Sequence, residues 1–190
     1  MTGVYREIIT AAWLVFVGYW LWGWRRLKPA KRADSLASTL LNTATTAAGF
    51  VLILAGPWRL GPLDARFLPS GAGGKLLGVA LVLAGLSLAI WARRVLGTNW
   101  SGRVRIRERQ ALVRSGPYAL VRHPIYTGMA LAVLGMALAA GRFQALLGVA
   151  LVVAAFARKA RIEERFLRAE FGDAYAEYMR GTKFLVPFVV

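Results

Sequence analysis

Cysteine is absent from this chain of 190 residues, and histidine occurs once, at His123. The absence of cysteine excludes disulfide bonds, thiolate catalysis and cysteine-based metal sites. A single histidine also excludes a histidine-rich metal site. We therefore expect no metal cofactor.

Acidic residues are scarce as well. Nine Asp and Glu stand against 25 Lys and Arg, which gives a formal net charge of +16. A positive excess of this size is compatible with nucleic-acid binding. Here the basic residues lie between apolar blocks and divide unevenly among the connections. That distribution favours a membrane protein, and we expect no nucleic-acid partner.

Long runs without any charge hold much of the hydrophobic content of 57%: Ile8–Trp24, Leu36–Gly56, Leu76–Ala92, Ile125–Ala140 and Phe143–Ala157. A bilayer span needs about 17–25 such residues, and the first three runs qualify. Only Gly141 and Arg142 separate the last two runs. Joined as one helix they would reach about 50 Å, too long for one span. We predict a helical hairpin with Arg142 snorkelling at its tip.

These runs predict an all-α integral membrane protein with five transmembrane helices. The fourth and fifth spans form the hairpin, and a cytoplasmic C-terminal helical tail closes a cofactor site. We expect one membrane domain, 1–190, with three scaffold spans in 1–92 and a catalytic loop, hairpin and tail in 93–190. The first run is followed by a basic cluster without a small-residue cleavage site, so we take it as a span. A water-soluble helical bundle is the alternative, which the uncharged runs disfavour.

The orientation follows from the basic residues. The N-terminus, second loop and hairpin tip carry 5 Lys and Arg in total, whereas the first loop, third loop and tail carry 20. Cytoplasmic connections are enriched in Lys and Arg. We therefore predict a multi-pass protein of the inner or plasma membrane, with its N-terminus outside and its C-terminus and active site in the cytoplasm, among membrane lipids.

The segments that flank the hairpin carry the remaining local signals. Val104–Arg107 alternates like a short strand. Pro124 fits the first turn of the fourth span, which places His123 at or next to an N-cap. Beyond the fifth span the helix continues as Arg158–Leu167, and a second short helix is expected at Asp173–Arg180. The apolar end, Phe184–Val190, is expected to fold back onto the membrane face.

Three groups of side chains meet at this cytoplasmic surface: Asn99, Trp100 and Tyr118 from the loop, Arg122, His123, Tyr126 and Gly128 from the fourth span, and Arg161, Glu163 and Glu164 from the fifth. The hairpin brings His123 near the two glutamates. Charged groups at the end of a membrane helix are functional candidates. Each also has an ordinary explanation, such as a membrane anchor, a cap or a surface ion pair. Their concentration in one place favours a site.

The pattern resembles the isoprenylcysteine carboxyl methyltransferase family and the related membrane phospholipid methyltransferases, in their prokaryotic form. The matching stretches are GPYALVRHPIYTG at 116–128, EERFLRAEFGDAYAEYM at 163–179 and Pro187-Phe188, and TNWSG at 98–102 is similar to bacterial members. The resemblance covers roughly 93–190. Gly181-Thr182-Lys183 departs from an Arg-Val-Pro-like sequence in the eukaryotic enzymes, which bears on the substrate rather than on the fold.

The resemblance implies S-adenosyl-L-methionine as methyl donor, leaving S-adenosyl-L-homocysteine, and no Gly-x-Gly-x-x-Gly motif follows a strand here. It implies cofactor-binding residues Gly116, Pro117, Tyr118, His123, Pro124, Tyr126, Gly128 and Glu163. Arg122, Arg161 and Glu164 are then the catalytic candidates, and Asn99 and Trp100 the substrate-binding ones. Within this scheme Gly128 would allow close approach of the donor to the backbone.

The acceptor is expected to be a lipophilic or prenylated small molecule that enters from the bilayer. Methyl transfer mainly requires alignment of nucleophile and methyl group. A carboxylate acceptor would need an arginine to hold it, whereas an amine would need a glutamate to take its proton. The residues fit both. An NADPH-dependent membrane reductase of the sterol or steroid type and a non-catalytic scaffold or transporter are the alternative functions.

Overall fold

The computed structural model describes residues 3–24, 30–54, 61–97, 105–107 and 111–185. Within these ranges the chain forms six α-helices and two short strands. The helices are α1 (Gly3–Trp24), α2 (Leu36–Leu54), α3 (Ala72–Leu96), α4 (Pro124–Ala140), α5 (Phe143–Phe171) and α6 (Asp173–Gly181). The strands are β1 (Ala30–Ala33) and β2 (Arg105–Arg107), and two short 3₁₀ turns, η1 (Gly61–Asp64) and η3 (Gly116–Ala119), complete the order.

Each predicted apolar run is helical over its described residues. Among the described residues, α1, α2 and α3 are long and apolar enough to cross a membrane, and α4 is a shorter apolar helix of 17 residues. The 29 residues of α5 combine the last apolar run with a charged extension of about four turns. The chain is therefore a multi-pass membrane protein, and the count of five spans stays a prediction.

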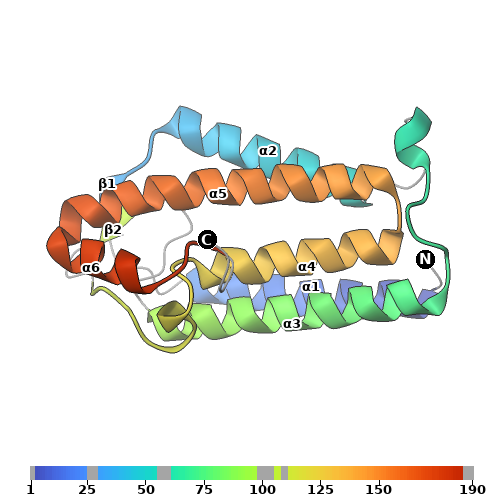
Figure 1. The fold of residues 1–190 in the computed structure, drawn as a ribbon, viewed down its shortest axis with the longest axis horizontal. Coiled ribbons are helices and arrows are strands. Elements are labelled where there is room, and N and C mark those ends of the chain that lie inside the picture. The colour runs from blue at the N-terminus through green and yellow to red at the C-terminus, as the bar shows by residue number, and fades with distance from the viewer. Residues whose placement is uncertain (1–2, 25–29, 55–60, 98–104, 108–110, 186–190) are drawn as a thin grey trace.

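The long helices lie side by side as a bundle (Figure 1). α3 packs most extensively on α4, and α2 on α5, while α1 packs against α3. α4 and α5 form the predicted hairpin. Gly141 ends α4 with a φ of +65°, in the left-handed region, and α5 starts at Phe143. At this tip the guanidinium of Arg142 donates a hydrogen bond to the Asp64 carbonyl oxygen at 2.8 Å.

Glycines set how closely the helices approach. A Cβ atom on Gly85 of α3 would lie 2.4 Å from the carbonyl oxygen of Gly128, and one on Gly128 would lie 2.5 Å from that of Gly85. Gly78 and Gly135 face each other in the same way. Small residues allow such backbone contact between membrane helices. Gly78 and Gly85 thus form a small-residue packing face on α3.

The two ends of the bundle differ in their connections. β1 and β2 pair antiparallel, and so tie the first loop to the third. They lie at the end of the bundle that also carries α6, whereas η1 and the α4–α5 turn lie at the opposite end (Figure 1). The strand expected at Val104–Arg107 is confirmed at Arg105–Arg107. The described parts of the first loop, the third loop and the tail thus lie at one end (Figure 1), as the charge count predicts.

Candidate active site

The start of α4 and the extension of α5 meet at the end of the bundle that carries α6 (Figure 1). His123 is the N-cap residue of α4, and Pro124 occupies the first turn, where a missing N–H costs nothing. Because α5 runs antiparallel to α4 and extends beyond its start, Glu163 and Glu164 come level with these residues. The topology therefore assembles a polar cluster from residues some 40 positions apart.

Glu164 forms the centre of this cluster. Its Oε1 accepts a hydrogen bond from Nε of Arg122 at 2.6 Å and lies 3.4 Å from Nε2 of His123. The side chains of Arg122 and Glu164 are only 10% and 9% exposed. A buried carboxylate is tolerated only with such partners. Arg122 and Glu164 are thus a tightly held ion pair.

Glu163 occupies the other side of the same imidazole. Its Oε2 lies 3.6 Å from Nδ1 of His123, and its Oε1 accepts a hydrogen bond from the Tyr126 hydroxyl at 2.7 Å. With a side chain 24% exposed, Glu163 is the more accessible of the two carboxylates. His123 therefore lies between two carboxylates, one enclosed and one open to a ligand.

The C-terminal segment covers the cluster. Arg122 donates to the carbonyl oxygens of Met179 and Thr182, and its backbone N–H donates to that of Lys183 at 2.8 Å. The Tyr178 hydroxyl donates to the Tyr118 carbonyl at 2.7 Å. These bonds join α6 and the residues after it to η3 and to the start of α4.

Aromatic rings surround the imidazole. Tyr126 stacks on His123 with 5.8 Å between ring centroids, and on Phe156 at 5.4 Å. Phe184 meets His123 edge-on at 5.4 Å. The guanidinium of Arg161 lies over the Phe184 ring at 5.6 Å. The polar cluster thus has apolar walls, which strengthen its electrostatic interactions.

The ionisation of the cluster follows from its contacts. Burial alone would lower the pKa of His123, but the hydrogen bonds to Glu163 and Glu164 outweigh burial and raise it above 6.5. Burial would raise the pKa of Glu164, yet its bonds to His123 and Arg122 lower it below 4.5. The two carboxylates therefore shift His123 toward its protonated form, and Glu164 stays ionised at neutral pH.

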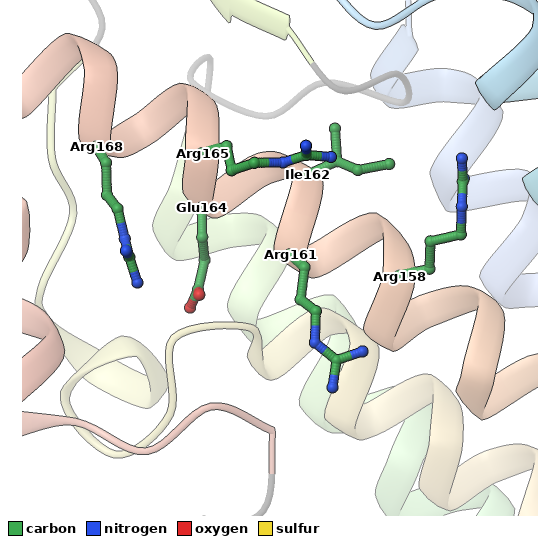
Figure 2. A pocket seen from close by; sticks show the side chains of 6 residues that line it. All are labelled: Arg158, Arg161, Ile162, Glu164, Arg165 and Arg168. Carbon is green, nitrogen blue, oxygen red and sulfur yellow. The ribbon is translucent and has the colours of Figure 1, made fainter.

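A cationic pocket of about 450 Å³ adjoins the cluster. It is lined by Arg158, Arg161, Ile162, Glu164, Arg165 and Arg168 (Figure 2). All six project from α5, and Glu164 is the residue that the pocket shares with the cluster. Sequence reasoning had singled out only Arg161 and Glu164 of this set.

The structure brings five predicted residues together: Arg122, His123, Tyr126, Glu163 and Glu164. Tyr118 lies buried beneath α6, and burial with the nearby Glu163 raises its pKa. Pro117 and Pro124 are fully buried. Asn99 and Trp100 lie outside the described residues, as does Pro187-Phe188.

Two glycines of the predicted donor site have packing roles in the fold. Gly128 was expected to make room for a ligand, but its Cβ position faces Gly85 and Ala89 of α3, so helix packing accounts for it. Gly116, with a φ of +60°, likewise turns toward Val95 at the end of α3. Contact of either glycine with the donor stays a prediction.

Other residues of the site were missed. Phe156 and Phe184 supply rings, and Tyr178 holds the C-terminal segment. The aromatic spacing after Gly172 was a signal for Tyr178. Carbonyl oxygens of Met179 and Thr182 have no sequence signal, because every residue carries one.

A bundle of apolar helices with a buried charged cluster at one end defines an integral membrane protein with an interfacial site. A family model described as phospholipid methyltransferase matches residues 74–174, just over half of the chain. The chain therefore belongs to the phospholipid methyltransferase family. The matched segment includes α3 from Gly74 onward, the α4–α5 hairpin and the whole polar cluster.

Two of three similar curated proteins are methyltransferases by name. The chain is 38% identical over 114 residues to the cobalt-zinc-cadmium resistance protein CzcN of Cupriavidus metallidurans, covering 57% of this chain and 49% of the relative. It is 35% identical over 79 residues to protein-S-isoprenylcysteine O-methyltransferase of Schizosaccharomyces pombe, covering 41% and 34%. It is 30% identical over 115 residues to protein-S-isoprenylcysteine O-methyltransferase B of Arabidopsis thaliana, and the match covers 59% of this chain and 58% of the relative. The chain thus matches about half, or less, of each relative's length.

A solved structure shares the fold. The eukaryotic intramembrane Ras methyltransferase ICMT (isoprenylcysteine carboxyl methyltransferase) aligns with a TM-score of 0.56 at 24% identity, over 77% of this chain and 52% of that one. At this identity the likeness concerns the fold alone. It supports the helical arrangement described above.

Proposed function

We propose that this protein is an integral membrane methyltransferase that takes the methyl group from S-adenosyl-L-methionine and transfers it to a lipophilic acceptor. The proposal includes five spans, with α4 and the apolar half of α5 as the last two. It also includes a cytoplasmic site beneath the C-terminal segment and a single domain over 1–190. Family membership supports the reaction class, and the site geometry supports the donor.

The arrangement of Glu163, Tyr126 and His123 carries the proposal. The half-open carboxylate of Glu163 lies beside aromatic faces and under the C-terminal segment. S-adenosyl-L-methionine bears an ammonium, a sulfonium, ribose hydroxyls and an adenine ring. Carboxylates accept hydrogen bonds from ammonium and hydroxyl groups, and aromatic faces attract sulfonium cations. The residues present therefore fit the donor, which supplies the methyl group when bound.

Each polar residue then has a separate task. Glu163 binds the donor through its accessible oxygens, and Tyr126 orients that carboxylate. Arg122 acts as a positioning residue, because its Nε and Nη1 are committed to Glu164 and to carbonyl oxygens of the C-terminal segment. His123 and Glu164 complete the enclosed half of the cluster. The hydrogen bonds of Arg122 hold the C-terminal segment over the site, and this cover keeps water out.

Arg161 is the candidate that faces the acceptor. Its guanidinium lies on the Phe184 ring at the pocket edge and forms no ion pair with a described carboxylate. It would hold an acceptor carboxylate about 3–3.5 Å from the methyl carbon, and no general base is needed for a group already ionised. The names of two relatives, isoprenylcysteine O-methyltransferases, support a prenylated acceptor of this kind.

The experiment is methyl transfer from radiolabelled S-adenosyl-L-methionine to a prenylcysteine acceptor in proteoliposomes, comparing the native protein with Glu163→Gln. The substitution keeps the shape but removes the charge that pairs with His123 and receives the Tyr126 hydroxyl. We expect transfer by the native protein and at least a roughly tenfold rise in the donor's KM for the variant, the loss of one charge-assisted bond. Glu177→Gln, at an exposed carboxylate on α6, is the matched control.

An unchanged donor KM in folded Glu163→Gln would contradict the assignment of Glu163. Methyl transfer to an amine lipid, with none to the prenylcysteine, would support the assigned donor site and contradict the proposed class of acceptor.

A further inference from the structure

Four arginines follow one face of α5 beyond its apolar half. Arg158, Arg161, Arg165 and Arg168 are spaced by three, four and three residues, and such a spacing places side chains on the same side of a helix. Their side chains line the pocket of about 450 Å³ shown in Figure 2. The proposed transfer reaction gives a role to Arg161 alone, so three of the four remain to be explained.

The positive charge of this pocket is not neutralised. Within the described part of the chain, none of the four arginines forms an ion pair with a carboxylate. Arg158 donates to the Ser38 hydroxyl at 2.8 Å, and Arg168 lies 3.2 Å from the Met179 sulfur. The exposed Arg165 has no described partner. Like charges at this spacing repel each other, which a bound anion would offset.

Glu164 does not neutralise the pocket either. Its carboxylate is already engaged by Arg122 at 2.6 Å and by His123. The lining therefore presents four guanidinium groups and one carboxylate that is paired elsewhere. The chemical class that matches several guanidinium forks is an oxyanion, because planar forks bind phosphate or carboxylate oxygens two at a time.

The position of the pocket along α5 indicates which oxyanion it binds. The uncharged part of α5 ends at Ala157, and Arg158 is the next residue. The four arginines then extend over about 15 Å of helix. The polar headgroup layer is where Lys and Arg beyond a span meet lipid phosphates. Glu163, by contrast, bonds to Tyr126 on the side of α5 that faces α4. Glu163 thus belongs to the cluster and not to the pocket lining, whereas Glu164 borders both.

We propose that this pocket binds the phosphate of an anionic membrane lipid, at a site separate from that of the methyl donor. The phosphate lies between the guanidinium groups of Arg165 and Arg168, which leaves Arg161 to the acceptor, and the acyl chains run along the apolar half of α5. A lipid held there is a structural partner of the protein. Because Glu164 borders both sites, the bound lipid also restricts the movement of the Glu164 side chain, which pairs with Arg122.

The test measures thermal unfolding of the purified full chain in neutral-detergent micelles. The probes are short-chain phosphatidylglycerol, phosphatidylcholine of the same chain length, and inorganic phosphate. We expect phosphatidylglycerol to raise the melting temperature in a saturable way, and the other two to leave it near its starting value. The variant is Arg165→Gln with Arg168→Gln, for which we expect on the order of tenfold weaker binding after the loss of charge-assisted bonds.

The matched control is Arg94→Gln with Arg180→Gln, which removes the same charge from exposed positions outside the pocket. It should bind phosphatidylglycerol like the native protein. Should the pocket variant not fold, Arg165→Gln alone gives the same comparison.

Three results would overturn the proposal. Equal weakening in the pocket and control variants would mean general charge attraction. An equal response to inorganic phosphate would assign the pocket to a soluble phosphate compound. Loss of the lipid response with S-adenosyl-L-homocysteine would make the pocket part of the donor site. None of these readouts depends on catalysis, so the proposed methyltransferase function stands or falls separately.

Discussion

At the scale of single residues, Glu164 determines the stability of the cluster. It receives both the Arg122 guanidinium and the His123 imidazole while its own side chain is 9% exposed. Removing one partner of such a buried pair costs about 3–5 kcal/mol, because a charge stays buried without compensation. The positions of these charges therefore matter more for folding than the total charge of the chain.

The pH dependence of stability follows from the same contacts. The pKa of His123 is raised above 6.5 in the folded protein, so its contribution is fully present below pH 6.5 and is lost as the pH rises through the folded value. The pKa of Glu164 is lowered below 4.5, so its contribution is present above pH 4.5 and is lost as the pH falls through the folded value. We predict that the melting temperature falls as the pH rises above 6.5.

His123→Gln should remove that alkaline decline, as measured by thermal unfolding in detergent over a pH series. If the melting temperatures of the native protein and the variant fall in parallel as the pH rises, a group other than His123 titrates.

The same scale shows what sequence reasoning can establish about the site. The hairpin topology and charge types were enough to bring His123 to Glu163 and Glu164, and those contacts are present. The sequence does not show that Arg122 is satisfied by carbonyl oxygens of the C-terminal segment, since any residue offers a carbonyl. The sequence does not predict that Arg165 and Arg168 line a pocket, because a pocket cannot be detected before the helix is placed.

At the scale of elements, two pairs of glycines hold α3 against α4. The Gly85–Gly128 pair lies close to the site, one turn below Pro124. Apolar runs predict both helices, and the small residues predict that α3 has a packing face. The partner is not evident from sequence, because a glycine that faces a helix and one that faces a ligand look alike. The contact of Gly128 with Gly85 therefore becomes evident only in the structure.

We predict that Gly85→Leu disrupts the bundle. Its Cβ atom would lie 2.4 Å from the Gly128 carbonyl oxygen and 2.6 Å from the Ala132 nitrogen, both backbone atoms that cannot move aside. Overpacking in a tight core typically costs about 1–3 kcal/mol, and backbone collisions cost more. The measurement is the yield of monodisperse protein in detergent together with its melting temperature.

Gly18→Leu in α1 is the control, because nothing lies within 4 Å of the Cβ position there. A Gly85→Leu protein as stable as this control would refute the account of α3–α4 packing.

At the scale of the whole molecule, the charge count and the fold agree on which connections lie together. β1 pairs with β2, and both lie at the end that carries α6 (Figure 1). The side of the membrane is a prediction from the count of Lys and Arg alone. The absence of cysteine makes it easy to test, because a single introduced cysteine has no background.

We predict that Ser70→Cys, before α3, reacts with a membrane-impermeant maleimide on intact cells. Ala169→Cys, on the extension of α5, should react only after the cells are opened. Both positions are exposed in the fold. The opposite labelling pattern would invert the orientation and move the site outside.

The central claim is that the cluster belongs to a binding site for the methyl donor. The most direct test is calorimetric titration of the folded, detergent-purified protein with S-adenosyl-L-homocysteine, with NADPH in parallel. We predict saturable binding of S-adenosyl-L-homocysteine, weakened by Glu163→Gln, and no binding of NADPH. Binding of NADPH alone would contradict the account in favour of a reductase, and binding of neither would contradict it in favour of a non-catalytic membrane protein.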